Sequence, residues 1–455
     1  VHNAWKSAEP GVLFWDTIIR ESVPDCYADL GYKTISTNPC GEIPLCPYDS
    51  CRLLAINLYS YVENPFTREA TFNYDKLREH VRLAQRIMDD IIDLELEKIE
   101  LIMQKIESDP ESEEVKGAEK HLWEKIYHKS RYGRRTGVGI TAEGDMIAAM
   151  GLKYGTPEAT YFSADIHKIV AVEAYRSSVQ MAKERGAFAI YDAEREKNNP
   201  FVNRIKSVDP ALYDEMVKYG RRNIACLTIA PTGTTSLMTQ TTSGIEPVFL
   251  PVHKRRRKVN PNDTNVHVDF VDESGDSFEE YIVYHPKFLT WMEVNNYDTS
   301  KNYTQEEIDE LIKISPYYGA TANDVDWLEK VKMQGAIQKW VDHSISVTIN
   351  LPNDVSEELV NSLYIEAWKS GCKGCTVYRD GSRSGVLIST KKSDKKEEEC
   401  HCKPPQVTET RPKSLVCDVV RFQNNKEKWV AFVGLLDGYP YEIFTGVLDD
   451  EDGIA

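Results

Sequence analysis

The chain has 455 residues, enough for two or three ordinary domains or for one large α/β domain with a small appendage. With 41% hydrophobic and 28% charged residues it has the composition of a soluble globular protein, and no apolar run approaches the roughly 20 residues that span a bilayer. The net charge of −17 would repel nucleic acid. These numbers exclude a membrane protein and a nonspecific DNA-binding protein.

The start of the chain and its cysteines indicate the compartment. Val1 is followed by neither the charged nor the apolar region of a signal peptide, which predicts a cytoplasmic protein. In a reducing cytosol the ten unevenly spaced cysteines are expected to be catalytic, metal-bound or buried, before they are expected to form disulfides.

Apolar residues at helical spacing predict a long amphipathic helix over residues 73–106 and another over residues 164–185. Short β-type runs at residues 224–229 and 345–351 alternate with such helices. This alternation is typical of an α/β protein.

The composition changes towards the carboxyl end of the chain. Residues 1–388 are expected to form the α/β core, and residues 389–413 form a charged, proline-containing linker. Residues 414–455 are expected to form a small β module, whose strands are predicted at residues 414–422, 428–435 and 439–444.

The first chemically suggestive segment is Asn38-Pro39-Cys40-Gly41-Glu42. In an extended backbone, Asn38, Cys40 and Glu42 would project to one side about 7 Å apart, which would present an amide, a thiol and a carboxylate to one ligand. Pro39 and Gly41 favour a constrained loop that a substrate can approach closely. Spacing alone leaves open a proline-glycine turn that carries a buried cysteine.

The longer strings at residues 36–45 and 51–58 strongly resemble the finger-loop region of ribonucleotide reductases, particularly the adenosylcobalamin-dependent class. The resemblance implies that Cys40 carries a transient thiyl radical that takes the 3′ hydrogen of the ribose. Glu42 would accept the proton of the 3′-hydroxyl, and Asn38 would hold the ribose by hydrogen bonds. A carboxylate in a dry pocket can be tuned for this role.

By the same resemblance, Cys51 is one of the two thiols that deliver the reducing electrons and finish as a disulfide. In the family the partner thiol lies on a strand well before the finger loop. Cys26 is the one cysteine in residues 1–37, and it is expected to be a packed thiol. The partner is therefore expected upstream of Val1, and this chain alone is expected to be inactive.

A second segment lies at residues 224–247. A buried strand at residues 224–229 is followed by a turn rich in glycine and hydroxyl groups, which suits phosphate if a helix begins there, although many such turns are only helix caps. The turn, with residues 244–247 close behind it, is similar to the substrate-phosphate loop of the same reductases. The residues predicted to bind substrate here are Pro231, Thr232, Gly233, Thr234, Thr235 and Ser236.

Further segments resemble the family, so that the likeness spans residues 1 to about 388; they are residues 134–151, 340–352 and 373–383. In the oxygen-dependent class, two adjacent tyrosines near the last segment relay the radical from a second subunit. Here Val377 precedes a lone Tyr378, which favours the cobalamin class.

Cys372 and Cys375 form a CxxC motif, and Cys400-His401-Cys402 follows, so these residues include enough ligands for a zinc site. The long charged spacer between them argues against it, and no metal site is assigned. The Cys400 and Cys402 pair could equally be a redox relay or incidental.

The basic run at residues 253–258 would by itself suggest a nucleic-acid patch, but in a chain of charge −17 it is expected to be a solvated loop.

Together these features predict an α/β fold that forms the carboxy-terminal part of a ten-stranded reductase barrel, with a small β-rich module. The implied activity is reduction of ribonucleotides, expected to be diphosphates, with adenosylcobalamin as radical source and a thioredoxin-like or glutaredoxin-like reductant. Neither nucleic acid nor a membrane is an expected partner, and a homodimer is left open. The alternatives are an oxygen-dependent reductase chain with a separate radical subunit, and a non-enzymatic zinc or nucleic-acid binding module.

Overall fold

In the computed structural model the chain divides into two compact units, residues 1–390 and 391–455, which are described separately. The structure describes residues 1–50, 52–259, 268–271, 277–382, 412, 414–424, 427–436 and 439–447. Cys51, Cys400 and Cys402, and the expected linker apart from Pro412, lie outside these residues. Among the described residues, no helix has both the length and the apolar character needed to cross a membrane.

The first unit begins with α1 (His2–Ser7), β1 (Val12–Leu13), α2 (Trp15–Glu21) and η1 (Pro24–Leu30). The strands β2 (Ser36–Thr37), β3 (Pro44–Leu45) and β4 (Leu53–Asn57) follow, then η2 (Leu58–Tyr61), β5 (Val62–Glu63) and β6 (Thr71–Phe72). Two long helices, α3 (Tyr74–Ser108) and α4 (Glu113–Gly133), lead to β7 (Gly137–Thr141) and α5 (Glu143–Ala149).

The middle of this unit is helical, with α6 (Pro157–Arg185), α7 (Ala193–Glu196), α8 (Pro200–Val208), α9 (Pro210–Tyr219) and α10 (Gly233–Thr239). Then come β8 (Val252–Lys258), β9 (Phe270–Val271), β10 (Ser277–Tyr284), α11 (Pro286–Val294), α12 (Gln305–Ile314) and α13 (Trp327–Gln338). The unit closes with β11 (Thr348–Leu351), α14 (Glu357–Lys369) and β12 (Gly374–Arg379).

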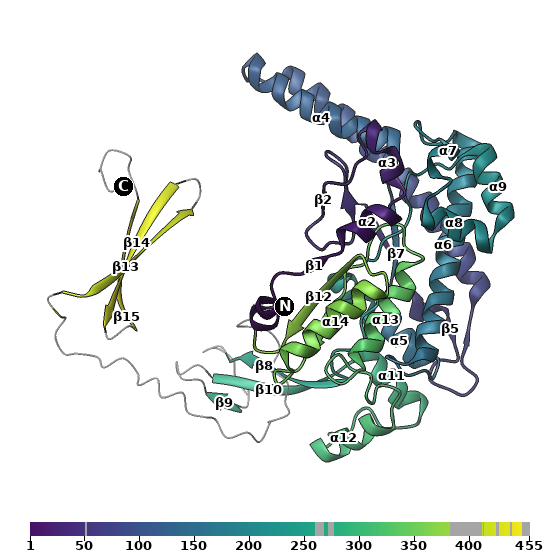
Figure 1. Ribbon diagram of the computed structural model, residues 1–455. Coiled ribbons are helices and arrows are strands. Elements are labelled where there is room, and N and C mark those ends of the chain that lie inside the picture. The colour runs from purple at the N-terminus through teal and green to yellow at the C-terminus, as the bar shows by residue number, and fades with distance from the viewer. Residues whose placement is uncertain are drawn as a thin grey trace. The chain divides into compact units, whose positions relative to one another are not determined.

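The core of the first unit is a row of parallel strands joined by helical crossovers (Figure 1). β4 pairs with β7, which is bridged through Val138 to Leu227. Ile229 is bridged in turn to Ile345, and β11, which follows Ile345 in the chain, pairs with β12. Parallel neighbours need long connections, and helices supply them here. The predicted α/β class is therefore confirmed.

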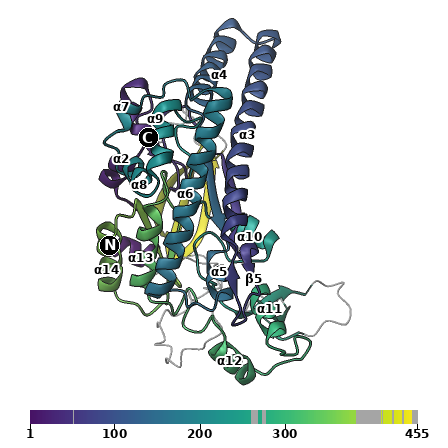
Figure 2. The ribbon, with the colours of Figure 1, turned by 90° about the vertical axis from the view of Figure 1, so that its right-hand side faces the viewer.

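α3 forms where the sequence predicts it, because its apolar residues recur on one face. Asn73 caps it, with the side chain accepting a hydrogen bond from the Lys76 N–H at 3.0 Å. Its buried face, which includes Leu77, Val81 and Met88, packs in the same core as the strand residue Val138. α3 and α4 form a long antiparallel hairpin (Figure 2).

The basic run at residues 253–258 was expected to be a solvated loop, and this expectation is wrong, because the run forms strand β8. This strand pairs antiparallel with β10, and the register places Glu279 opposite Arg257. Arg257 and Glu279 form an ion pair at 2.9 Å. Cross-strand acidic partners allow the charged run to adopt a strand.

The second unit contains β13 (Val416–Asn424), β14 (Glu427–Leu436) and β15 (Tyr439–Val447). They form an antiparallel sheet with β14 in the centre. The three strands predicted in residues 414–444 are confirmed, each with ends within a few residues of the prediction.

Candidate functional site

Residues 36–45, here called the finger hairpin, form a tight turn between β2 and β3. Ser36 pairs with Leu45, and Thr37 pairs with Pro44. At the tip, the Gly41 N–H donates to the Asn38 carbonyl at 3.0 Å, and Gly41 has φ +77°. A side chain at this φ would be strained, which explains the glycine. Residues 38–42 therefore do not have the extended backbone considered for them, and they form the constrained loop that Pro39 and Gly41 favour.

All three predicted catalytic residues lie in the hairpin turn, and the charge of Glu42 acts on the Cys40 thiol. The Asn38 Oδ1 accepts a hydrogen bond from the Ile43 N–H at 3.0 Å, which leaves the Nδ2 amide to donate to a ligand. Cys40 is exposed at the tip, whereas Glu42 is only 2% exposed. The Glu42 Oε2 has no hydrogen-bond partner among the described residues. A buried carboxylate oxygen without a partner favours a ligand or a proton at this point.

The Cys40 thiol is held in its protonated form. Partial burial, and secondarily the negative charge of Glu42, raise the pKa of Cys40 above its ordinary value of 9.0. At neutral pH, Cys40 therefore keeps its S–H bond. This state suits transfer of a hydrogen atom better than attack by a thiolate.

The finger hairpin is hydrogen-bonded to the strand row next to its tip. The Glu42 carbonyl accepts one hydrogen bond from the Ser344 N–H at 2.8 Å and another from the Thr228 Oγ1 at 2.7 Å. Both donors are buried and lie on the two extended segments bridged through Ile229 and Ile345. The hairpin tip is therefore fixed relative to the strand row.

The predicted phosphate turn, Pro231 to Ser236, follows residues 224–229 and leads into α10. Residues 224–229 form isolated parallel bridges at Leu227 and Ile229 instead of the predicted strand. Thr232 has φ +53°, and its Oγ1 accepts the Gly244 N–H at 2.7 Å and pairs with the Thr141 Oγ1 at 2.9 Å. The turn is mostly exposed. Its first helical N–H groups have no intrahelical acceptors, as at any helix start.

Glu246, which follows this turn, is tied to two other elements. Its Oε2 lies 2.8 Å from the Lys330 Nζ of α13, and its Oε1 accepts the Thr348 N–H of β11 at 2.7 Å. The segment 244–247 is therefore a structural connection between the turn and the strand row.

The cysteines outside the finger hairpin differ in their surroundings. Cys26 is partly buried beside an aromatic cluster, and burial raises its pKa to about 11, which agrees with a packed thiol. Cys372 and Cys375 are buried, and burial raises the pKa of Cys375 to about 12. Within the described residues, no grouping of metal-ligating atoms includes either of them.

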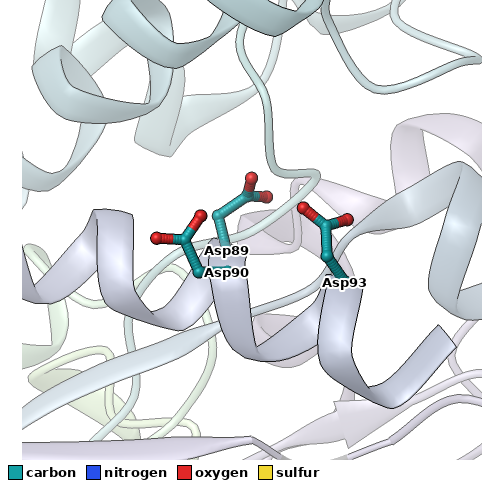
Figure 3. Close-up of side chains that lie close together, drawn as sticks. All are labelled: Asp89, Asp90 and Asp93. Carbon is teal, nitrogen blue, oxygen red and sulfur yellow. The ribbon is translucent and has the colours of Figure 1, made fainter. Parts of the chain in front are cut away.

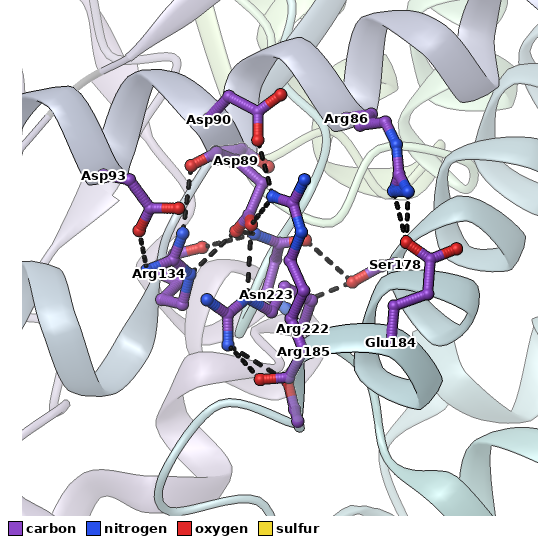
Figure 4. A network of polar contacts seen from close by, with 12 residues as sticks. Arg86, Asp89, Asp90, Asp93, Arg134, Ser178, Glu184, Arg185, Arg222 and Asn223 are labelled. Carbon is purple, nitrogen blue, oxygen red and sulfur yellow. Dashed lines mark hydrogen bonds and ion pairs between the residues drawn. The ribbon is translucent and has the colours of Figure 1, made fainter.

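One grouping of carboxylates could hold a cation by distance alone: Asp89, Asp90 and Asp93 on α3 (Figure 3). Figure 4 shows that arginine side chains already form ion pairs with these carboxylates. Asp89 and Asp93 both pair with Arg134 at 2.7 Å, and Arg185 pairs with Asp90 at 2.5 Å. We therefore assign no metal to this cluster.

One cavity, with a volume of about 530 Å³, is lined by residues such as Lys153, Asp324 and Trp327. None of the predicted site residues lines it. The candidate site is therefore defined by the finger hairpin and the turn at residues 231–236, rather than by this cavity.

Sequence reasoning about single residues missed two buried residues behind the hairpin, Arg135 and His343. Arg135 is 2% exposed and His343 is 1% exposed. Charged and polar residues are usually assigned to the surface, so neither attracts attention in the sequence. The position of these two residues in the chain could have identified them, because both lie in segments that resemble the family.

Comparisons with known proteins indicate one family over most of the chain. The family model described as "Ribonucleotide reductase, barrel domain" matches residues 1–378, and that of the "NrdJ homologue C-terminal domain" matches residues 415–455. The chain is 30% identical to the vitamin B12-dependent ribonucleoside-diphosphate reductase of Thermoplasma acidophilum, over 87% of this chain and 44% of that protein. It is 28% identical to the enzyme of the same name from Mycobacterium tuberculosis, over 85% of this chain and 47% of that protein.

The chain thus spans less than half the length of these two relatives. Among solved structures, the class Id ribonucleotide reductase alpha subunit of Actinobacillus ureae has a similar fold, with a TM-score of 0.54 and 16% identity. The match covers 83% of this chain and 59% of that subunit. On the match to residues 1–378, the chain belongs to the ribonucleotide reductase family and carries part of its barrel domain.

Proposed function

We propose that this chain carries the substrate-reducing site of an adenosylcobalamin-dependent ribonucleotide reductase, with ribonucleoside diphosphates as substrates. The observation that carries the proposal is the finger hairpin, where an exposed protonated thiol at Cys40 lies beside the buried carboxylate of Glu42. The names of the relatives from Thermoplasma acidophilum and Mycobacterium tuberculosis support both the reaction and the cofactor.

In the proposed reaction, the sulfur-bound hydrogen atom of Cys40 passes to the radical source, and the resulting thiyl takes the 3′ hydrogen of the ribose. The 2′-hydroxyl leaves as water, and the two electrons come from the reducing thiols, which finish as a disulfide. Glu42 accepts the 3′-hydroxyl proton, because its Oε2 is buried without a partner among the described residues and can take a proton from a ligand. Asn38 donates from its Nδ2 to a ribose hydroxyl, since Ile43 already occupies its Oδ1. Pro39 and Gly41 let the ribose approach the backbone closely.

Adenosylcobalamin, when bound, supplies the radical chemistry through its weak cobalt–carbon bond. The exposed position of Cys40 fits a radical source that approaches from outside the hairpin. Of the described residues, only Cys40 is assigned a role toward this group.

The remaining assignments follow from the same proposal. Cys51 is one reducing thiol, and a thioredoxin-like or glutaredoxin-like protein restores it. Substrate phosphate binds the turn formed by Pro231, Thr232, Gly233, Thr234, Thr235 and Ser236, where helix N–H groups and hydroxyls can donate. Residues 1–388 form the barrel part and residues 414–455 a separate module. Redox cycling of free thiols needs a reducing compartment, so we place the protein in the cytoplasm.

The oxygen-dependent class is the second candidate. It would relay its radical through paired tyrosines, whereas here Val377 precedes the single Tyr378 on β12. The zinc or nucleic-acid binding alternative has less support, because Cys372 and Cys375 are buried and the basic strand β8 is partly neutralised by Glu279.

The test uses the complete protein that contains this chain. Incubated with adenosylcobalamin, a ribonucleoside diphosphate and a dithiol, it should form the 2′-deoxyribonucleotide, measured by chromatography. Cys40→Ser should abolish turnover, and Cys417→Ser, which removes another exposed cysteine, should retain it. Turnover that needs a second metal-containing subunit instead of cobalamin would favour the oxygen-dependent class.

A further inference from the structure

Behind the finger hairpin lies a buried guanidinium that touches several segments at once. The Arg135 Nε donates to the Asp49 Oδ2 at 2.7 Å, and its Nη1 donates to the Pro44 carbonyl of β3 at 3.1 Å. The same Nη1 lies 3.0 Å from the His343 Nε2. Asp49 is 1% exposed in its side chain. One side chain therefore joins the hairpin, the residues that follow it and the segment before β11.

The hydrogen bonds of His343 fix its tautomer. Its Nδ1 lies 2.9 Å from the Leu227 carbonyl, which can only accept, so Nδ1 carries the proton. The Nε2 then has a free lone pair that accepts from Arg135. Burial, together with Arg135 and Lys373, lowers the pKa of His343 well below its ordinary range, so the imidazole is neutral.

The residue after His343 continues this connection to the backbone of Glu42. Ser344, the next residue, donates its N–H to the Glu42 carbonyl at 2.8 Å. On the other side, the Lys373 Nζ donates to the carbonyls of Asp342 at 2.7 Å and His343 at 2.5 Å. The Asp342 carboxylate in turn accepts the N–H groups of Cys226 and Leu227 at 2.7 and 2.8 Å. Residues 342–344 are thus held rigidly from two sides.

The finger hairpin has little structure of its own to oppose movement. Its paired strands, β2 and β3, are two residues each. A hairpin this small is marginal alone, so its position must be set by contacts with its surroundings. Arg135 contacts β3 directly, and His343 orients Arg135.

We propose that Arg135 and His343 are positioning residues, which hold the finger hairpin, with Cys40 and Glu42, in place against the strand row. Neither is a catalytic residue, since their contacts are to the hairpin and the strand row. The proposal takes its functional meaning from the proposed reductase activity, but the contacts do not depend on it.

The arrangement also explains why arginine suits this place. Arg135 donates in two directions from one planar group, from Nε to a carboxylate and from Nη1 to a carbonyl and an imidazole. A lysine has one ammonium group, which cannot reach all three acceptors in this geometry. Arg135→Lys should therefore loosen the hairpin even though it conserves the charge.

The test measures the pH dependence of Cys40 alkylation in the folded chain, by peptide mapping after brief iodoacetamide treatment. Cys417, which is also exposed, serves as the reference thiol in the same molecule. Two matched variants separate the two hydrogen bonds of His343. His343→Gln can keep an acceptor near the place of Nε2, whereas His343→Asn can keep only the donor near the place of Nδ1.

We expect His343→Asn and Arg135→Lys to loosen the finger hairpin and to expose Cys40 to more solvent. This weakens the burial that raises the pKa of Cys40, so its alkylation profile should shift to lower pH. At a fixed pH below the midpoint, Cys40 should react roughly three-fold faster relative to Cys417. His343→Gln should keep the wild-type profile. This readout needs no turnover, so its failure is distinct from failure of the proposed activity.

Leu77→Ala in α3 is the control for general destabilisation, because Leu77 is fully buried in the core and has no contact with the hairpin among those described. It should leave the Cys40 profile unchanged. An unchanged profile in both His343→Asn and Arg135→Lys would overturn the proposal. An equal shift in Leu77→Ala, or in His343→Gln, would overturn it as well.

Discussion

The finger hairpin and the turn at residues 231–236 are both proposed to bind the substrate, and they are stabilised in different ways. Each contains a residue at positive φ, Gly41 at +77° and Thr232 at +53°. The hairpin depends on side chains that are distant in sequence, such as Arg135 and Thr228. The turn depends largely on one hydroxyl of its own, the Thr232 Oγ1. The thiol and carboxylate are thus positioned by side chains of other segments, whereas the phosphate turn provides the hydroxyl that ties it to Thr141 and Gly244.

The largest expected effect is on the external support of the hairpin. Asp49→Ala leaves the Arg135 guanidinium buried without its carboxylate, which should reduce the free energy of unfolding by about 3–5 kcal/mol. Urea denaturation followed by circular dichroism would measure it. Asp29→Ala, which breaks the exposed pair with Arg195, should have a much smaller effect. Equal losses would mean that the hairpin has no special dependence on the Arg135 pair.

The second prediction concerns Lys373, whose Nζ donates to the carbonyls of Asp342 and His343. Burial lowers its pKa from 10.5 to about 8, so between these values the unfolded chain binds the proton and the folded chain does not. Relative to Lys373→Met, the wild-type free energy of unfolding should therefore rise with pH, by about 3 kcal/mol from pH 8 to 10.5. Unfolding measured in both proteins across this window would test it. A difference that is constant with pH would show that the lysine is not held this way.

The third prediction concerns the Thr232 hydroxyl in the turn at residues 231–236. Thr232→Val keeps the branched shape but removes the acceptor for the Gly244 N–H, and should lower the free energy of unfolding by about 1–2 kcal/mol. Thr232→Ser keeps the hydroxyl and should stay close to wild type. If the two variants were equally stable, the turn would have to be stabilised by other contacts.

The smallest effect is a local change of charge. Glu42→Gln removes the carboxylate that contributes to the raised pKa of Cys40, so that pKa should fall and the thiolate should form at lower pH. Iodoacetamide should therefore alkylate Cys40 faster at a fixed pH near 8. No acceleration would mean that burial alone controls the thiol, and that Glu42 lies too far away to assist it.

These contrasts also explain how much could be predicted from the sequence. α3 and the strands of the second unit were predictable, because a repeating apolar pattern directly reports the buried face. The turn and helix at residues 231–239 were predictable from local residue types, whereas residues 224–229 form isolated bridges instead of the predicted strand. The residues of the finger hairpin were found through their resemblance to a family.

The alternation of side chains along an extended strand did not predict the conformation of that hairpin. The Gly41 N–H and the Asn38 carbonyl close a turn that an extended strand lacks. The strand β8 was missed because its charged residues hide the alternation of faces, and its acidic partner Glu279 lies in a distant strand. Arg135 and His343 depend on long-range contacts, which no local pattern reports.

The most direct test of the account is the fate of the ribose 3′ hydrogen in the complete protein. With adenosylcobalamin and a 3′-deuterated ribonucleoside diphosphate, we predict slower deoxyribonucleotide formation than with the unlabelled substrate, and no product from Cys40→Ser. Deoxyribonucleotide formed by Cys40→Ser, or equal rates with the two substrates under single-turnover conditions limited by chemistry, would contradict the assignment of Cys40 as the group that takes this hydrogen.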